Sequence, residues 1–495
     1  MLRYLRQLTA ESFVYGLSSV ISRFIGILLL PIYTRVLTPE DYGVVSLMTS
    51  TMYLVITFAG LALDTASMRW YWDTEETPDR KRTMASWAWC QLAVSSLLGF
   101  MIYASADTLS VVLIGRADAG ELFRINAFVL PLGTLGWVAT NWLRLQRRPW
   151  QTMGFNLLTS LIHIFVTILL VAVLRTGIAG IFLSQAIAGL ISSAIAIGLM
   201  KDWLHPRYFL PQRLREMLKY ALPLIPAALA FWVVNSSSRY FIQSFSTTSE
   251  VGLFQVGSSF AIVVAVVSSA FQQAWNAFAL SIHKRDEARQ VFAVVFLAYC
   301  WISCFLSTAV ALFAPEALRL LATEVYVGAS EVVSFLAFSY AMVGLAQIAA
   351  IGPTVAKTTQ PTGIGVTLAA GANILTNLLL VPPFGKVGAA AAALASQSVI
   401  PAYVFYRGQR IYPIPYRFGV AFALFVLSWV LIGIGSRLPS NEFWLSVAIK
   451  LILLSLFIPA TFALRIVSVA QVVELYHRAR LGLPARLSAR RPTND

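Results

Sequence analysis

Two arginines lie inside stretches of sequence that are otherwise typical of membrane-spanning helices. Arg23 stands near the middle of ESFVYGLSSVISRFIGILLLPIYTRVL, and Arg239 follows the serines of NSSSRYFIQSF. A charged side chain near the centre of a bilayer costs about 2.5–3.5 kcal/mol on insertion scales. A planar guanidinium binds phosphate oxygens through two parallel hydrogen bonds. Both arginines are therefore candidates for holding a phosphate group.

Helical spacing gives both arginines polar neighbours. One face of the first stretch carries small or polar residues every three or four positions, at Ser12, Tyr15, Ser19, Arg23 and Gly26. Asn235, Arg239 and Gln243 follow one another at i, i+4 spacing. We expect these faces to contact protein or water. The alternatives are that Arg23 bonds facing carbonyls or a carboxylate, and that Arg239 is an interfacial anchor.

Arg69 and Arg124 are weaker candidates for the same anion site. Arg69 stands beside Trp70, Tyr71 and Trp72, which equally fits an aromatic belt with a charged residue at the membrane surface. Arg124 lies three residues after Glu121 on the same predicted helix, so the two side chains could simply pair.

Neutral polar residues within the apolar stretches are further candidates. His163 could relay protons near neutral pH, or bond between helices. Gln272, Gln273 and Asn276 in FQQAWNAF could bond sugar hydroxyls, or join neighbouring helices. The same two interpretations apply to Asn373, Asn377 and Gln397.

Composition shows what kind of chain carries these residues. Of 495 residues, 58% are hydrophobic and 12% are charged. A soluble chain would have about twice that charged fraction. Apolar runs long enough to cross a hydrocarbon layer about 30 Å thick recur throughout. We predict an all-helical polytopic membrane protein with fourteen spans, near 12–33, 43–63, 84–104, 121–141, 152–174, 178–200, 219–242, 250–274, 289–313, 331–352, 361–381, 386–406, 416–436 and 443–465.

The placement of the 37 lysines and arginines predicts the orientation. With both termini in the cytoplasm, most of them fall in cytoplasmic loops and the tail, as the positive-inside rule expects. The net charge of +15 then meets anionic lipid headgroups and is no sign of nucleic-acid binding. The three cysteines all fall inside spans, and we predict neither a disulfide framework nor a metal site.

A weak internal repeat divides the chain. TPEDYGVVSLMTS resembles TTSEVGLFQVGSS at an offset of 209, and TGIAGIFLSQ resembles KVGAAAAALASQ at an offset near 212. The offset spans six helices, an even number, which predicts parallel repeats with a cavity between them. The predicted domains are 1–215 and 216–410 as six-helix bundles, 411–467 as an appended helix pair, and 468–495 as a basic cytoplasmic tail.

The chain resembles the multidrug/oligosaccharidyl-lipid/polysaccharide exporter superfamily, and within it the bacterial polysaccharide flippases of the Wzx type. The resemblance rests on LLLPIYTRVLTPEDYG, GLALDTASMRWYW, NSSSRYFIQSF and KVGAAAAALASQ, and on the pattern of six, six and two spans. It implies a V-shaped pair of bundles that carries an undecaprenyl-pyrophosphate-linked oligosaccharide from the inner to the outer leaflet of the bacterial plasma membrane by alternating access. In related lipid II flippases, arginines in the first helices of both halves line a cationic cavity, and the last two helices form a groove for the lipid tail. Arg23 and Arg239 are in comparable places.

Other functions fit the residues less well. A multidrug antiporter for organic cations needs buried acids, and the predicted spans contain almost none. A membrane polysaccharide polymerase or ligase usually needs a long outer loop with a clustered catalytic site, and the outer loops are short. We therefore expect a transporter, not an enzyme, without a cofactor. Its coupling ion, H⁺ or Na⁺, is left open, and a polymerase and a chain-length regulator are candidate partners.

Overall fold

The computed structural model describes residues 29–437 and 443–464, and within these ranges the chain is helical, with no strand. The predicted fold class, an all-helical polytopic membrane protein, is confirmed. The first predicted span, with Arg23, lies outside the described residues except for a helical end at 29–36. The predicted tail at 468–495 also lies outside them.

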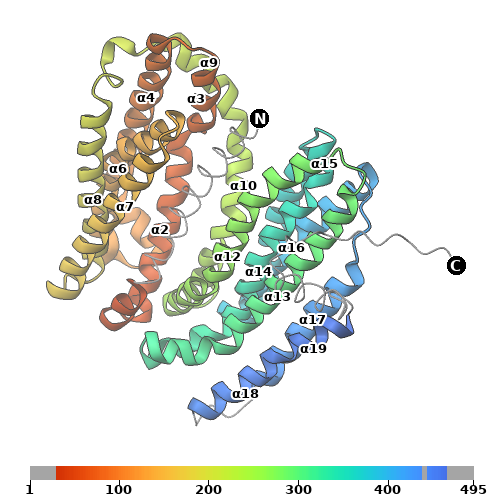
Figure 1. The fold of residues 1–495 in the computed structure, drawn as a ribbon. Coiled ribbons are helices and arrows are strands. Elements are labelled where there is room, and N and C mark those ends of the chain that lie inside the picture. The colour runs from red at the N-terminus through yellow and green to blue at the C-terminus, as the bar shows by residue number, and fades with distance from the viewer. Residues whose placement is uncertain (1–28, 438–442, 465–495) are drawn as a thin grey trace.

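The first part of the described chain contains five long helices and several short ones (Figure 1). The long helices are α2 (Pro39–Gly60), α4 (Thr77–Ala104), α6 (Gly120–Leu145), α7 (Pro149–Thr167) and α8 (Gly177–Met200). The short ones are α3 (Leu63–Trp72), α5 (Ala106–Leu109), η1 (Ser110–Ile114), η2 (Ala117–Ala119), η3 (Ile168–Val173) and η4 (Pro206–Tyr208).

The second part begins with a helix that is interrupted several times. It consists of α9 (Pro211–Ala221), η5 (Leu222–Leu224), α10 (Ile225–Ser236) and α11 (Ser238–Phe245). The remaining elements are α12 (Thr248–Ile282), α13 (Ala288–Leu321), η6 (Glu324–Ala329), α14 (Ser330–Ala349), α15 (Ile351–Val355), α16 (Gln360–Ile411), α17 (Phe418–Gly435), α18 (Phe443–Ser455) and α19 (Phe457–Ala463).

Twelve helical stretches of the described ranges are long and apolar enough to cross a membrane. One of them, α16, has 52 residues, which at 1.5 Å per residue exceeds a bilayer's thickness about twofold. Its path changes at Gly385, where φ is 51° and ψ is −130°, a combination that favours glycine. The predicted spans 361–381 and 386–406 therefore lie on the two sides of this bend. The count of fourteen remains a prediction.

The helices of the first part form one group, and those of the second part form another. The two groups meet at one end of the molecule and separate at the other (Figure 1). We call the joined end, which carries the N-terminus of α2 and the start of α12, the outer end, because the charge bias predicts that it faces outside. Between Tyr42 and Met52, α2 is mostly buried. Farther along, Tyr53 and Ile56 are 47% and 48% exposed. The groups thus contact each other through the outer half of α2.

The short helix α9 is amphipathic and packs on the first group of helices. Met217 and Ala221 are buried against the first group of helices, together with the partly buried Leu214 and Leu218. Arg213 on the same helix makes hydrogen bonds of 2.9 Å to both carboxylate oxygens of Asp79 on α4. The connection between the two groups is therefore fixed onto α4.

The structure contains one buried acid that the predicted spans did not include. The predicted span 289–313 ends before Glu316, and Lys450 lies in the predicted span 443–465. In the structure α13 continues to Leu321. Lys450 Nζ lies 2.6 Å from Glu316 Oε1, and the two side chains are 6% and 5% exposed. Ser446 Oγ donates to the same oxygen at 2.7 Å. This buried ion pair joins α18 to the second group.

We expect Lys450→Met to destabilise the protein by about 3–5 kcal/mol, since it leaves a buried carboxylate without its counter-charge. Exchanging the charges, as Glu316→Lys with Lys450→Glu, should recover part of the loss. The measurement is thermal unfolding in detergent. Lys386→Met is the matched control, because Lys386 pairs at 2.9 Å with Glu331, whose side chain is 55% exposed. This control should cost about 1 kcal/mol or less. Equal stability of Lys450→Met and wild type would contradict a stabilising pair.

Candidate functional site

A polar cavity of about 240 Å³ lies between the two groups of helices near the outer end. Its walls come from α2, from α10 and α11, and from α12. Aromatic and hydroxyl side chains line one side, and Asn235, Arg239 and Gln255 line the other. Of the candidates from the sequence, the structure brings Arg239 and Asn235 together here.

Arg239 lies in the first turn of α11. Ser237, the middle one of three consecutive serines, separates α10 from α11. Ser237 Oγ donates to Asn373 Oδ1 on α16 at 2.7 Å, so the break is attached to the second group. Asn373 also donates to Ser396 Oγ at 3.0 Å. Asn373 therefore joins neighbouring helices, which is the second of the two interpretations that the sequence left open for it.

The guanidinium of Arg239 bridges the two groups of helices. Its Nη2 donates to Gln255 Oε1 on α12 at 2.8 Å, and its Nε donates to Ser46 Oγ on α2 at 3.1 Å. Ser46 in turn donates to Gln255 Oε1 at 3.1 Å. Nη1 donates to the carbonyl of Asn235 at 3.0 Å. The cation lies 5.6 Å from the ring centre of Phe254.

All of these partners are neutral. Within residues 29–437 and 443–464, Arg239 forms no ion pair with a carboxylate. Neutral acceptors satisfy its N–H groups but leave its charge uncompensated, and a nearby cavity would therefore attract an anion. A phosphate is one such anion, and a guanidinium can donate to two of its oxygens at once.

Three residues before Ser46 and Gln255, two glycines allow the backbones of α2 and α12 to cross. A Cβ atom added to Gly43 would overlap the carbonyl of Thr248, and one added to Gly252 would overlap the carbonyl of Pro39. These glycines are the pair that the weak repeat aligned, and Ser46 and Gln255 have the same separation in sequence. The repeated segments thus contact each other at the outer end.

Arg69 and Arg124 are not part of this cavity. Arg69 is exposed on α3, beyond the far end of α2, roughly 20 Å or more from Ser46 by helix rise. Arg124 Nη2 lies 2.6 Å from Asp107 Oδ2. The sequence suggested Glu121 as its partner; Asp107 replaces it because α5 packs on the start of α6, where Gly120 leaves room.

The remaining polar candidates lie elsewhere. Gln272, Gln273 and Asn276 follow Gln255 on α12 by about 25 Å or more of helix rise, and line none of the cavities described here. His163 on α7 has a buried Nε2 without a hydrogen-bond partner among the described residues. Gln397 donates to Asn235 Oδ1 at 3.3 Å and thereby supports the cavity wall.

Most cavity-lining residues of α2 were not among the candidates from the sequence. Tyr42, Ser46, Thr49 and Tyr53 all line the cavity. They recur at spacings of four, three and four residues, which is the period of one helix face. This pattern was present in the segment YGVVSLMTSTMY and could have identified them.

A second cavity, of about 420 Å³, is almost entirely apolar and lies between α13, α14, α16 and α17. The buried Phe296, Phe338 and Phe405 line it within the second group, and Phe422 and Phe425 line it from α17. Such a cavity can accept a hydrocarbon chain, and it borders the helix pair that the sequence set apart.

Comparisons with known proteins agree with this architecture. A sequence profile of the family described as "Polysaccharide biosynthesis protein" matches residues 8–276. The succinoglycan biosynthesis transport protein ExoT of Rhizobium meliloti (strain 1021) is 22% identical over 265 residues, which is 52% of this chain and 51% of that protein. The match thus spans about half the length of this curated relative.

Solved structures with the same fold cover nearly the whole chain. The lipid II flippase MurJ in an inward closed conformation superposes with a TM-score of 0.73, at 13% identity, over 95% of this chain and all of that one. An inward-facing multidrug resistance MATE family transporter of the MOP superfamily gives 0.60, at 16% identity, over 81% and 95%. At sequence identities this low, the structural similarity shows a shared fold only.

Proposed function

Because this chain belongs to the family of polysaccharide biosynthesis proteins, we propose that it is a flippase for an undecaprenyl-pyrophosphate-linked oligosaccharide. It would move this lipid from the cytoplasmic to the outer leaflet of a bacterial plasma membrane, for the synthesis of a surface polysaccharide. Transport by alternating access, without a chemical reaction on the substrate, is the activity we assign to it.

The observation that carries this proposal is the cation of Arg239. It faces a cavity with walls from both groups of helices, and each of its hydrogen-bond partners is neutral. A pyrophosphate entering the cavity would supply the missing negative charge. Hydroxyl and amide groups of the same wall, including those of Thr49 and Asn235, would face the first sugars.

The contact between the groups supports alternating access. Along α2 this contact lies in the outer half, while the farther half exposes large side chains. In the orientation that the charge bias predicts, this is an inward-facing shape in which the headgroup enters from the cytoplasm. Opening the contact at Gly43 and Gly252 would then release it on the other side.

An antiporter of organic cations, which shares this fold, fits less well. It requires an accessible buried acid, but the buried Glu316 is already neutralised by Lys450 at 2.6 Å. The polar cavity described above contains a cation and no carboxylate. A polysaccharide polymerase would add sugars to a product, which nothing in this cavity is arranged to do.

The apolar cavity beside α17 is our proposed place for the prenyl tail. We expect a photoreactive polyprenyl probe to label residues within 416–465, and Phe422 and Phe425 above all, because both line this cavity. Phe165 on α7 is the control, since it is 69% exposed but borders no such cavity. The labelled residues are identified by mass spectrometry of the crosslinked peptides. Labelling confined to residues before 411 would contradict the proposal.

Reconstitution tests the activity itself. We expect vesicles containing the chain to bring a fluorescent undecaprenyl-pyrophosphate-linked glycan within reach of an impermeant quencher faster than protein-free vesicles do. A proton or sodium gradient applied across the vesicles would reveal the coupling ion. A rate equal to that of empty vesicles, together with uptake of an organic cation, would refute the assignment. In cells, a polymerase and a chain-length regulator are the partners we expect.

A further inference from the structure

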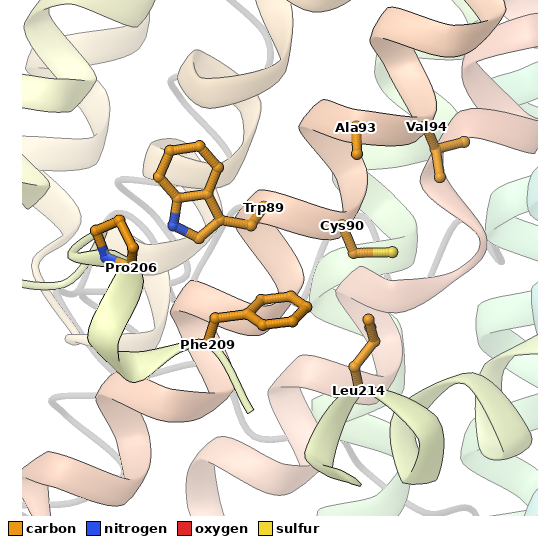
Figure 2. A pocket seen from close by; sticks show the side chains of 7 residues that line it. All are labelled: Trp89, Cys90, Ala93, Val94, Pro206, Phe209 and Leu214. Atoms are coloured by element: carbon orange, nitrogen blue, oxygen red, sulfur yellow. The ribbon is translucent and has the colours of Figure 1, made fainter. Parts of the chain in front are cut away.

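A third cavity, of about 560 Å³, lies far from Arg239, between α4 and the connection that joins the two groups of helices. Figure 2 shows the side chains that line it. Trp89 and Cys90 come from α4, Phe209 follows η4, and Leu214 comes from α9. The lining contains no charged side chain. Its size falls in the range of ligand-binding pockets, about 300–1,000 Å³.

Three attachments fix the connection onto α4 beside this cavity. Trp89 Nε1 donates to the carbonyl of Leu204 at 2.9 Å. The backbone N–H of Leu210 donates to Ser86 Oγ at 2.9 Å. Arg213 is bound to Asp79 through both carboxylate oxygens. These bonds attach the connection to α4 at three points, and thereby hold Phe209 and Leu214 in the lining of the cavity.

The connection that covers this cavity is strongly basic. Residues 201–219 carry five cations against two carboxylates: Lys201, Arg207, Arg213, Arg215 and Lys219 against Asp202 and Glu216. Arg207 and Arg215, next to the lining residues Pro206 and Leu214, are exposed. Neither forms an ion pair with a described carboxylate. The charge bias places this segment at the inner leaflet, whose anionic lipids attract such groups.

We propose that this cavity binds one acyl chain of an anionic phospholipid of the inner leaflet, with its phosphate held by Arg207 and Arg215. Moving an acyl chain from the bilayer into the cavity gains little free energy, because both surroundings are apolar. The cavity therefore determines where the lipid binds, and the two cations determine the selectivity for an anionic headgroup. A bound lipid would brace the connection between the two groups of helices. This inference requires that the chain is embedded in a bilayer with the connection at the inner leaflet, as the charge bias predicts, and not that it is a flippase.

Native mass spectrometry of the full chain, released from vesicles of mixed phosphatidylglycerol and phosphatidylcholine, tests the site. We expect one phosphatidylglycerol to be retained, with a preference over phosphatidylcholine of about tenfold or more from two cations. Ala93→Trp, which fills the cavity, should abolish retention, whereas Ala104→Trp on the exposed surface of the same helix should not. Arg207→Gln with Arg215→Gln should remove the preference; Lys284→Gln with Arg285→Gln, an equal loss of charge in another loop, should keep it.

Cys90 gives a second measurement that needs no change in the cavity. Its alkylation by a lipid-soluble maleimide should slow in phosphatidylglycerol vesicles relative to phosphatidylcholine vesicles, with alkylation of the denatured chain as the reference. Equal retention of both lipids, retention that survives Ala93→Trp, or equal alkylation of Cys90 in both vesicles would overturn the proposal. Displacement of the bound lipid by undecaprenyl phosphate at equimolar amounts would assign the cavity to a prenyl chain and likewise overturn it.

Discussion

Arg239→Glu is expected to abolish surface polysaccharide in a deletion strain complemented with the variant, because it puts a carboxylate where the pyrophosphate must bind. Arg239→Ala should lower occupancy ten- to more than a hundredfold, from the loss of a charge-assisted bond of about 1.5–3 kcal/mol. Arg239→Lys should rescue part of the activity, since it keeps the charge but loses the planar fork. The measurement is polysaccharide per cell at matched membrane expression.

The controls separate substrate binding from the bridge that Arg239 makes between Ser46 and Gln255. Ser46→Ala removes one end of that bridge and keeps the cation, so it should cost far less activity than Arg239→Ala. Arg124→Ala removes a cation whose partner is the exposed Asp107, and should leave activity near wild type. If Ser46→Ala were as damaging as Arg239→Ala, the arginine would be a structural bridge. Arg23→Glu should match Arg239→Glu, if Arg23 reaches the same cavity from the first helix.

Gly43→Ala is expected to prevent closure of the outer end. The added Cβ would overlap the carbonyl of Thr248, which belongs to the backbone and cannot rotate away. Overpacking of this kind costs typically about 1–3 kcal/mol. That energy would shift the equilibrium between the two conformations roughly five- to over a hundredfold toward the one open to the outside. Gly252→Ala should do the same, since its Cβ would overlap the carbonyl of Pro39.

Accessibility of a cysteine at Thr49, a residue of the polar cavity, measures this shift. In a chain otherwise free of cysteine, an impermeant thiol reagent applied outside should label it faster in Gly43→Ala than in the parent, and transport should fall. Gly60→Ala is the matched control on the same helix, because no atom lies within 4 Å of the Cβ it would add. Unchanged labelling and transport in Gly43→Ala would mean that the crossing at the outer end is not a gate.

The sequence by itself determined the membrane architecture, because that depends on local quantities. The length and apolarity of each run set the helices, and a hydrocarbon layer admits little else. The bounds of α8, Gly177–Met200, fall within a residue of the predicted span 178–200. The polar face of NSSSRYFIQSF likewise predicted Arg239 and Asn235 as candidate site residues from the sequence alone.

Tertiary structure decided which polar groups meet. Ser46 and Gln255 are 209 residues apart, and only the crossing of α2 and α12 places both against Arg239. The pairing of Glu316 with Lys450 also depends on how α18 docks on α13, since neither helix alone can satisfy its charge. Hydropathy measures how a residue partitions into the bilayer but carries no information about its partner on another helix. For that reason the cations could be found in the sequence, whereas the pairing of each cation with a particular neutral or acidic side chain could not.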